Sequence, residues 1–188
     1  MYETKSTGNL TVADYLSGEQ DSEVRHEYLC GEVYAMAGAS VFHNLIATNL
    51  VRAFAIAAAQ GPCRVYSSDM KVRVADDIFY YPDILVVCEE LADTYFETAP
   101  CVVVEILSAS TARRDRFEKR LAYQAVESLQ LYLLVDSRKQ AARGYYRTKT
   151  GWQERVFEVG QPVPVPCLNS ELSFEELYAK VKFTGGQL

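Results

Sequence analysis

Apolar side chains recur at every third or fourth position between Phe42 and Ala57, the spacing that places them on one face of an α-helix. Ser40 stands just before this run, where a hydroxyl can cap the first turn, and Gly61-Pro62 would stop the element. The pattern therefore predicts one long helix in the first third of the chain. A shorter helix is expected to begin after Thr11 and to end near Gly18.

The remaining pattern alternates between strands and helices. Short runs around Cys30-Gly31 predict a hairpin of two antiparallel strands. Further strands are expected from Arg64 through residue 74, at 78–87 with a break at Pro82-Asp83, and at 101–107, 129–135, 141–147 and 153–157. Helices are expected at 108–126 and 173–181. This order favours an α/β (α+β) fold, a mixed central β-sheet flanked by helices, in a single domain over residues 1–188.

Composition narrows the class of protein. Apolar residues make up 49% of the chain and charged residues 23%, as in globular domains. The longest uninterrupted small and apolar run, residues 53–59, is too short to cross a bilayer, so no membrane contact is expected. The opening residues lack a basic, then apolar, secretory pattern, so a cytoplasmic location is expected. The five cysteines form no Cys-x-x-Cys pair, which argues against a disulfide framework and against a structural zinc site, and three of them are expected to pack as small apolar side chains.

Charge is uneven along the chain. The net charge is −6, yet residues 113–149 hold ten basic and four acidic side chains. A basic stretch within an acidic protein is a possible footprint for a polyanion such as nucleic acid. The alternative is an ordinary solvated helix face followed by an exposed hairpin.

Two acids interrupt strands that are otherwise apolar. Asp83 follows Pro82, and Glu105 lies between Val104 and Ile106. A carboxylate desolvated in a sheet is costly unless a base or a metal ion pairs with it, and Mg²⁺ accepts one or two such ligands. The alternative is an acid at a strand end that reaches solvent or an arginine.

The helix predicted after Glu105 carries a second polar series. Asp115, Lys119 and Tyr123 are four residues apart and share one stripe, while Phe117 and Leu121 are expected on the buried side. Lys119 could reach back toward Glu105. An ordinary surface pair between Asp115 and Lys119 explains the spacing as well.

These residues form an ordered series along the chain that resembles a known family, the Uma-two-type restriction endonucleases of the PD-(D/E)XK nuclease superfamily. The matching segments are Tyr81-Pro82-Asp83-Ile84-Leu85-Val86-Val87, Val103-Val104-Glu105-Ile106-Leu107-Ser108 with Ser110-Thr111, the helix residues Asp115, Lys119 and Tyr123, and Leu131-Tyr132-Leu133-Leu134-Val135-Asp136. Upstream, Arg25-His26-Glu27-Tyr28-Leu29, Gly31-Glu32 and His43 are similar to the family's opening segment. The resemblance runs from about Val12 to Asp136.

The resemblance implies a restriction-endonuclease-like core and a metal-dependent endonuclease. Asp83 and Glu105, with the Ile106 carbonyl, would bind Mg²⁺ or Mn²⁺, and Lys119 would complete the catalytic set. The usual Glu-x-Lys pattern places lysine where this chain has Leu107. The lysine role has therefore either moved to Lys119 or is absent.

The expected substrate is nucleic acid, most simply DNA, cut by a homodimer with two sites. Arg113, Arg114, Arg116 and Arg120 are the candidate contacts to the phosphate backbone. Two rival interpretations remain: a catalytically inactive nucleic-acid-binding or scaffold module with the same fold, and a metal hydrolase with a different substrate. Three weaker candidates remain. For His43 a core role is favoured over a catalytic one, and Glu27 and Glu32 are expected to be structural. Tyr145-Tyr146 could stack on bases, although alternation along a strand explains the pair as well.

Overall fold

The computed structural model describes residues 9–36, 38–109 and 111–183, so Ser110 of the predicted motif lies outside the described residues. The helices are α1 (Val12–Gln20), α2 (Val41–Ala58), α3 (Ala112–Arg114), the π-helix η1 (Asp115–Lys119), α4 (Arg120–Ala125), the 3₁₀-helix η2 (Pro166–Leu168) and α5 (Phe174–Leu177). The strands are β1 (His26–Leu29), β2 (Glu32–Ala35), β3 (Arg64–Ser67), β4 (Lys71–Ala75), β5 (Ile78–Tyr80), β6 (Ile84–Val87), β7 (Phe96–Glu97), β8 (Pro100–Leu107), β9 (Leu131–Asp136), β10 (Ala142–Thr148), β11 (Gly151–Phe157), β12 (Val163–Val165) and β13 (Ser170–Leu172).

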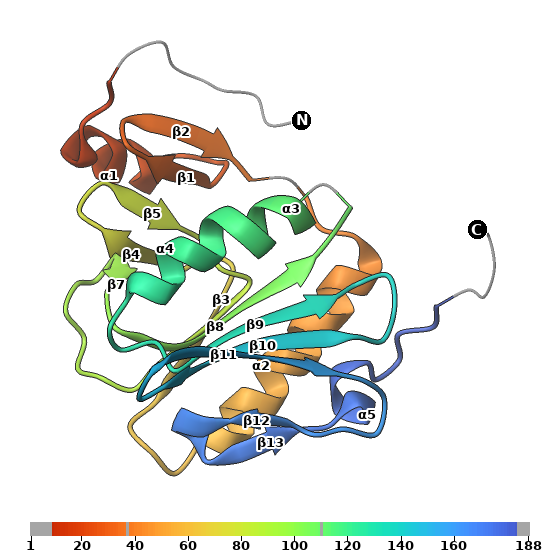
Figure 1. The fold of residues 1–188 in the computed structure, drawn as a ribbon. Coiled ribbons are helices and arrows are strands. Elements are labelled where there is room, and N and C mark those ends of the chain that lie inside the picture. The colour runs from red at the N-terminus through yellow and green to blue at the C-terminus, as the bar shows by residue number, and fades with distance from the viewer. Residues whose placement is uncertain (1–8, 37, 110, 184–188) are drawn as a thin grey trace.

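The central sheet has six strands in the order β11-β10-β9-β8-β6-β3 (Figure 1). Strands β8 and β9 run parallel, and the other neighbours are antiparallel. The segment from α3 to α4 makes the crossover that a parallel pair requires. The predicted mixed sheet flanked by helices is therefore confirmed.

Helix α2 covers one face of this sheet (Figure 1). Its N-cap is Ser40, as predicted, and Ile46, Leu50 and Phe54 are buried against the alternate residues of β6 and β8. By length and composition alone α2 could cross a membrane, but a core helix passes the same test. Here its apolar stripe packs on the sheet.

The opposite face of the sheet packs against α4. Strand β8 sends Val103 and Leu107 to this face and Val104 and Ile106 to the α2 face. Because side chains alternate along a strand, Glu105 shares the face of Val103 and Leu107. The acid thus points toward the helix that follows its own strand.

A second sheet, in the order β2-β1-β5-β4-β7, lies beside the crossover helices (Figure 1). Tyr15 of α1 packs there on Tyr28 and Phe79. The predicted break at Pro82-Asp83 is where the chain leaves β5 in this sheet and enters β6 in the central one. This crossing delivers Asp83 to the edge of the central sheet.

The helix predicted at 108–126 differs from the observed one. It is divided into α3, the π-helix η1 and α4, and it buries Asp115, Lys119 and Tyr123. Phe117 and Leu121, expected on the buried side, are 61% and 64% exposed. The expectation was wrong because the polar stripe is held inward by ion pairs with other elements, which the apolar pattern does not reveal. The predicted last helix is also shorter, ending at Leu177, and β7, β12 and β13 were not predicted.

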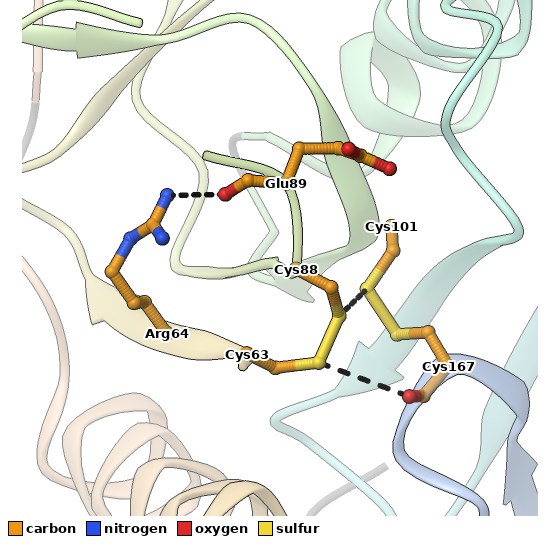
Figure 2. Close-up of a disulfide and its surroundings, with 6 residues drawn as sticks. All are labelled: Cys63, Arg64, Cys88, Glu89, Cys101 and Cys167. Atoms are coloured by element: carbon orange, nitrogen blue, oxygen red, sulfur yellow. Dashed lines mark hydrogen bonds between the residues drawn. A yellow bond between two sulfur atoms is a disulfide. The ribbon is translucent and has the colours of Figure 1, made fainter. Parts of the chain in front are cut away.

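The cysteine expectation is wrong as well. Disulfides join Cys63 to Cys88 and Cys101 to Cys167, and the two bonds lie side by side (Figure 2). Cys30 is exposed and free. The four bonded cysteines come from distant parts of the chain, so their spacing in the sequence gives no signal that they meet.

Candidate active site

A cleft of about 550 Å³ opens where the N-terminal turn of α2, the start of β6, the end of β8 and the helix segment after β8 meet. Titratable side chains dominate its chemistry. They are Glu27, His43, Asp83, Glu105, Asp115 and Lys119. The cleft therefore gathers side chains from β1, α2, the residue before β6, β8 and η1.

Asp83 and Glu105 lie directly across from each other. Strands β6 and β8 are antiparallel and pair Ile84 with Val104, so the next positions outward are Asp83 and Glu105. Opposed residues in such a pair send their side chains to the same face. Both carboxylates therefore line one side of the cleft.

The Asp83 carboxylate is held through one of its oxygens. Oδ2 accepts the backbone N–H of Ile106 at 2.7 Å and lies 3.2 Å from Nε2 of His43. In the described part of the chain these two contacts both involve Oδ2. Oδ1 is therefore available for a ligand in the cleft.

Glu105 is 4% exposed and meets the helix through Oε1. That oxygen accepts a hydrogen bond from Nζ of Lys119 at 2.9 Å and a longer one, 3.4 Å, from the hydroxyl of Tyr123. Among the described residues Oε2 has no hydrogen bond of this kind. Asp83 and Glu105 thus share one property. In each carboxylate one oxygen is held by hydrogen bonds within the protein, and the other is available to a ligand.

Glu27 belongs to the site, although the sequence analysis expected it to have a structural role. Its Oε1 lies 2.8 Å from Nζ of Lys119, and its Oε2 lies 2.7 Å from Nη1 of Arg114. Both oxygens are therefore engaged with cations, which distinguishes Glu27 from Asp83 and Glu105. Apolar periodicity gives no information about a strand residue that pairs with a distant helix, so it could not identify Glu27. The only sequence signal for Glu27 is that it lies in the Glu27-Tyr28 segment, which is similar to the family's opening segment.

The charges in the cleft do not balance. Four carboxyl groups (Glu27, Asp83, Glu105 and Asp115) face two permanent cations, Lys119 and Arg114. Burial raises the pKa of Glu105 well above its usual range, and the nearby charge of Lys119 only partly offsets that rise. Burial likewise raises the pKa of Asp115, against the opposing charge of Lys119. The site therefore has an excess of acid that an added cation would relieve.

Lys119 is the centre of this network. Burial alone would lower the pKa of its ammonium, but the charges of Glu105, Glu27 and Asp115 outweigh burial and hold the pKa well above the usual value. Asp115 lies farther from Nζ, at 3.7 Å, than the two glutamates do. Lys119 is therefore a fixed positive charge inside the cleft.

His43 lies in the cleft although the sequence favoured a core role for it. Its side chain is 16% exposed, and Nε2 contacts Asp83. Burial lowers the pKa of the imidazole, while the hydrogen bond to Asp83 and the charge of that acid raise it, and the net shift is upward. Because His43 is in the first turn of α2, the capped start of this helix positions it beside the acid.

The four candidate arginines separate in the structure. Arg113 and Arg116 are exposed, and Arg120 is partly buried with its guanidinium over the ring of Tyr145. Arg114 is 15% exposed and pairs with Glu27 and Glu118. Their role as phosphate contacts stays a prediction, and Arg113 and Arg116 present the accessible charges.

The structure favours the ordinary strand explanation for Tyr145-Tyr146 over base stacking, and it gives Arg147 a structural role. Tyr145 and Tyr146 are only 5% and 7% exposed, so they pack in the core and do not offer rings for base stacking. Arg147 donates to the carbonyls of Leu129 and Val126 and closes the end of α4. The basic residues after residue 140 therefore include structural ones, which local charge counts cannot separate from exposed ones.

The donor set fits a hard divalent cation. Asp83 and Glu105 supply carboxylate oxygens, which Mg²⁺ and Mn²⁺ prefer. The N–H and C=O of one strand residue point to the same side, so the Ile106 carbonyl faces the side of Asp83, to which its N–H is bonded. Leu107 is 3% exposed in the core and carries no ligand atom on its side chain.

A mixed sheet flanked by helices, with paired acids on adjacent strands, is the arrangement of a restriction-endonuclease-like fold, and here the lysine beside the acids comes from the following helix segment. The chain belongs to the Uma2 family, described as "Putative restriction endonuclease", whose profile matches residues 12–178. The fold and the family expected from the resemblance are therefore confirmed.

Relatives and a solved structure agree with this assignment. The chain is 31% identical to "Uncharacterized protein slr1290" of Synechocystis sp. over 93% of this chain and 94% of that one. It is 34% identical to "Uncharacterized protein sll1609" of the same organism over 70% and 77% of the two chains. The crystal structure of "a putative nuclease belonging to DUF820" from Anabaena variabilis superposes with a TM-score of 0.70 at 21% identity, covering 84% of this chain and 91% of that one. The last similarity shows the fold.

The family carries a general expectation for the chemistry. Its description as a restriction endonuclease implies a nuclease, whose substrate is nucleic acid, and restriction endonucleases of this kind generally use divalent metals. The roles of Asp83, Glu105 and Lys119 are read from the geometry above and stay predictions.

Proposed function

We propose that this protein is a Mg²⁺-dependent endonuclease that hydrolyses phosphodiester bonds in DNA, with Mn²⁺ able to replace Mg²⁺. The observation that supports it most is the pair formed by Asp83 and Glu105. They lie opposite each other on adjacent strands, each with one carboxylate oxygen engaged by the protein and the other left toward the cleft.

The residues take separate roles. Asp83 and Glu105, with the Ile106 carbonyl, would hold the cation, which when bound lowers the pKa of a coordinated water and stabilises charge on phosphate. Lys119 supplies a fixed positive charge beside Glu105, where it can orient the attacking water and stabilise the negative charge that develops at phosphorus. His43 and the Ile106 N–H position Asp83.

DNA is favoured over a small substrate by charge at the mouth of the cleft. Strands β8 and β9 are parallel and pair Leu107 with Asp136, so the loops that follow them leave the same edge of the sheet. The exposed Arg138 and Lys139 lie in the second loop, and the exposed Arg113 and Arg116 follow the first. Basic side chains that flank an acidic cleft can hold the phosphate backbone on both sides of the scissile bond.

Two further parts of the proposal concern assembly and location. Cutting both strands of a duplex needs two sites, so a homodimer is the simplest active form for a chain of this size. A cytoplasmic location is proposed from the sequence alone.

The competing function is a nucleic-acid-binding module without catalysis. The observation that favours it is Leu107, a buried leucine at the usual lysine position. Against it stands Lys119, whose ammonium contacts Glu105 inside the cleft.

A cleavage assay separates the two functions. Purified wild type, Asp83→Asn and Asp76→Asn are incubated with supercoiled plasmid and with labelled single- and double-stranded DNA, in Mg²⁺, Mn²⁺ or chelator. Asp76 is the matched control because its carboxylate is fully exposed and it is not among the residues that line the cleft. We expect nicking and linearisation by wild type and Asp76→Asn only with the metals, and none by Asp83→Asn.

A binding measurement supports the same assay. Mg²⁺ should raise the melting temperature of wild type and of Asp76→Asn but not of Asp83→Asn, because a ligand stabilises the fold only through sites it occupies. Equal cleavage by wild type and Asp83→Asn would overturn the assignment of the site. DNA binding without cleavage in either metal would favour the inactive module.

A further inference from the structure

Four cysteines converge at the end of the central sheet remote from the cleft. Cys63 precedes β3, Cys88 follows β6, Cys101 is the second residue of β8 and Cys167 is in η2. Strands β3 and β6 pair Arg64 with Val87, so Cys63 and Cys88 are the next opposed positions. We call these four residues the four-cysteine cluster (Figure 2).

Three sulfur atoms of the four-cysteine cluster form one group that links the two disulfides, and the fourth, Sγ of Cys63, is bonded to one of them. Sγ of Cys88 lies 3.4 Å from Sγ of Cys101, although these two cysteines are not bonded to each other. The Sγ atoms of Cys88, Cys101 and Cys167 all lie within 4.8 Å of one another. Cys63 is joined to Cys88 by a disulfide, and its Sγ lies 3.9 Å from the Cys167 carbonyl oxygen.

These separations match the coordination sphere of a single ion. Zinc binds thiolates tetrahedrally at about 2.3 Å, which places neighbouring sulfurs roughly 3.8 Å apart. The 3.4 Å between Sγ of Cys88 and Sγ of Cys101 is close to that value, and Sγ of Cys167 lies within 4.8 Å of both. An iron–sulfur cluster places its thiolates around several iron atoms and needs a wider arrangement.

We propose that the four-cysteine cluster is a second metal site, which binds one Zn²⁺ through four thiolates when its disulfides are reduced. Each disulfide takes two electrons and two protons from a dithiol reductant of the thioredoxin class, which itself becomes a disulfide. The four thiols then bind Zn²⁺ and release four protons, giving a tetrathiolate complex of charge −2. In the reverse direction two molecules of a disulfide oxidant take up the four electrons and four protons and become thiols, the two protein disulfides form again, and Zn²⁺ is released.

The zinc site is distinct from the cleft in ligand type and in position. Thiolates are soft ligands that select Zn²⁺, whereas the carboxylates of Asp83 and Glu105 select Mg²⁺ or Mn²⁺. Cys101 and Glu105 lie on the same strand but near its opposite ends. The two sites can therefore be loaded and tested separately, and this proposal does not depend on the nuclease function.

Either state of the four-cysteine cluster ties the C-terminal segment to the sheet. Cys167 lies between β12 and β13, and the residues around it, Val165 and Leu168, pack in the core formed with α2. Cys101 is 5% exposed within that core. The bound ion would replace one covalent link between β8 and η2 by a coordinate link at the same place.

The test begins with the chain reduced by a phosphine under anaerobic conditions and titrated with Co²⁺, then with Zn²⁺. We expect one Co²⁺ per chain, with intense thiolate-to-cobalt charge-transfer bands and the visible bands of tetrahedral cobalt, both removed by Zn²⁺. Cys167→Ser and Cys88→Ser should lose these bands, because each removes one thiolate ligand. These two positions are chosen because their side chains are only partly buried, so the fold should tolerate the change. Cys30→Ser, at the exposed free cysteine, is the matched control and should keep them.

The outcomes exclude the alternatives. Asp83→Asn should retain the charge-transfer bands, because a cobalt ion held by carboxylates gives none of that intensity. Untreated oxidised chain should bind no Co²⁺ at the cluster, and its mass should be lower than that of the reduced chain by four hydrogen atoms, two for each disulfide. A reduced, folded wild type whose five thiols all react with a thiol reagent at the same rate with and without Zn²⁺ would overturn the proposal.

Discussion

Lys119 and Glu105 are joined across the crossover between β8 and η1 by a hydrogen bond of 2.9 Å, with both side chains buried. Fourteen residues separate them in the chain, so the lysine reaches the acid from the next element rather than from the same strand. This geometry gives a physical account of Leu107. At the strand position where the family pattern usually has lysine, the Leu107 side chain packs in the core, and Lys119 of the helix segment supplies the positive charge.

Removal of the Lys119 charge should damage the fold as well as the activity. Lys119→Met leaves Glu105 and Glu27 buried without their shared cation, and breaking a buried pair in this way costs about 3–5 kcal/mol. Lys149→Met, in the exposed turn between β10 and β11, is the control and should change stability by less than about 0.5 kcal/mol. Urea unfolding measures both. Equal stability of the two variants would show that Lys119 is not bound in the network.

The face that the crossover helix buries can be tested by truncation. Phe117→Ala and Leu121→Ala should each cost less than about 0.5 kcal/mol, because both side chains are largely exposed. Tyr123→Ala should cost about 3–5 kcal/mol, because its ring is fully buried against Tyr80 and Tyr132. Urea unfolding of the three variants distinguishes this arrangement from the one that apolar spacing predicts, in which the first two are the costly ones.

The sequence predicted the elements whose signal is local. The α2 stripe, the hairpin at Cys30-Gly31 and the buried strands follow from periodicity and turn residues. Asp83 and Glu105 could be identified because a buried carboxylate within an apolar strand is costly unless a base or a metal ion pairs with it. The site was predictable to that extent, and the family resemblance added Lys119.

The rest depends on contacts between distant segments. Glu27 is ordinary in its own strand and becomes part of the site only through Arg114 and Lys119. The π-helix turns the crossover so that charged residues face inward, which reverses the amphipathic prediction. The strands β12 and β13 were missed because they are three residues long and proline interrupts the first.

Stability at low pH should depend on Asp136. Burial alone would raise the pKa of this carboxyl, but hydrogen bonds from the Arg138 side chain and backbone outweigh burial and hold the pKa below its usual value. The ionised form is therefore favoured by folding, and its contribution is present at neutral pH and is lost as the pH falls through the lowered pKa. Asp136→Asn should be about 1 kcal/mol less stable than wild type at pH 7. The difference should shrink toward pH 3 in urea unfolding.

The control for that prediction is Asp76→Asn. Asp76 also pairs with an arginine, but its side chain is fully exposed, so the same substitution should leave the pH dependence close to that of wild type. A gap between wild type and Asp136→Asn that is constant from pH 7 to pH 3 would mean that Asp136 stabilises the fold by packing rather than by charge.

The path of DNA across the protein can be read from salt dependence. Arg113 and Arg116 are exposed next to the cleft, and each phosphate contact contributes about 0.9 to the slope of log affinity against log salt on duplex DNA. The Arg113→Gln, Arg116→Gln double variant should therefore lower that slope by about 1.8. Fluorescence anisotropy of a labelled duplex, measured in chelator to prevent cleavage, gives the slopes. Arg52→Gln, exposed on α2, is the control and should bind like wild type. An unchanged slope in the double variant would place the duplex on another face of the protein.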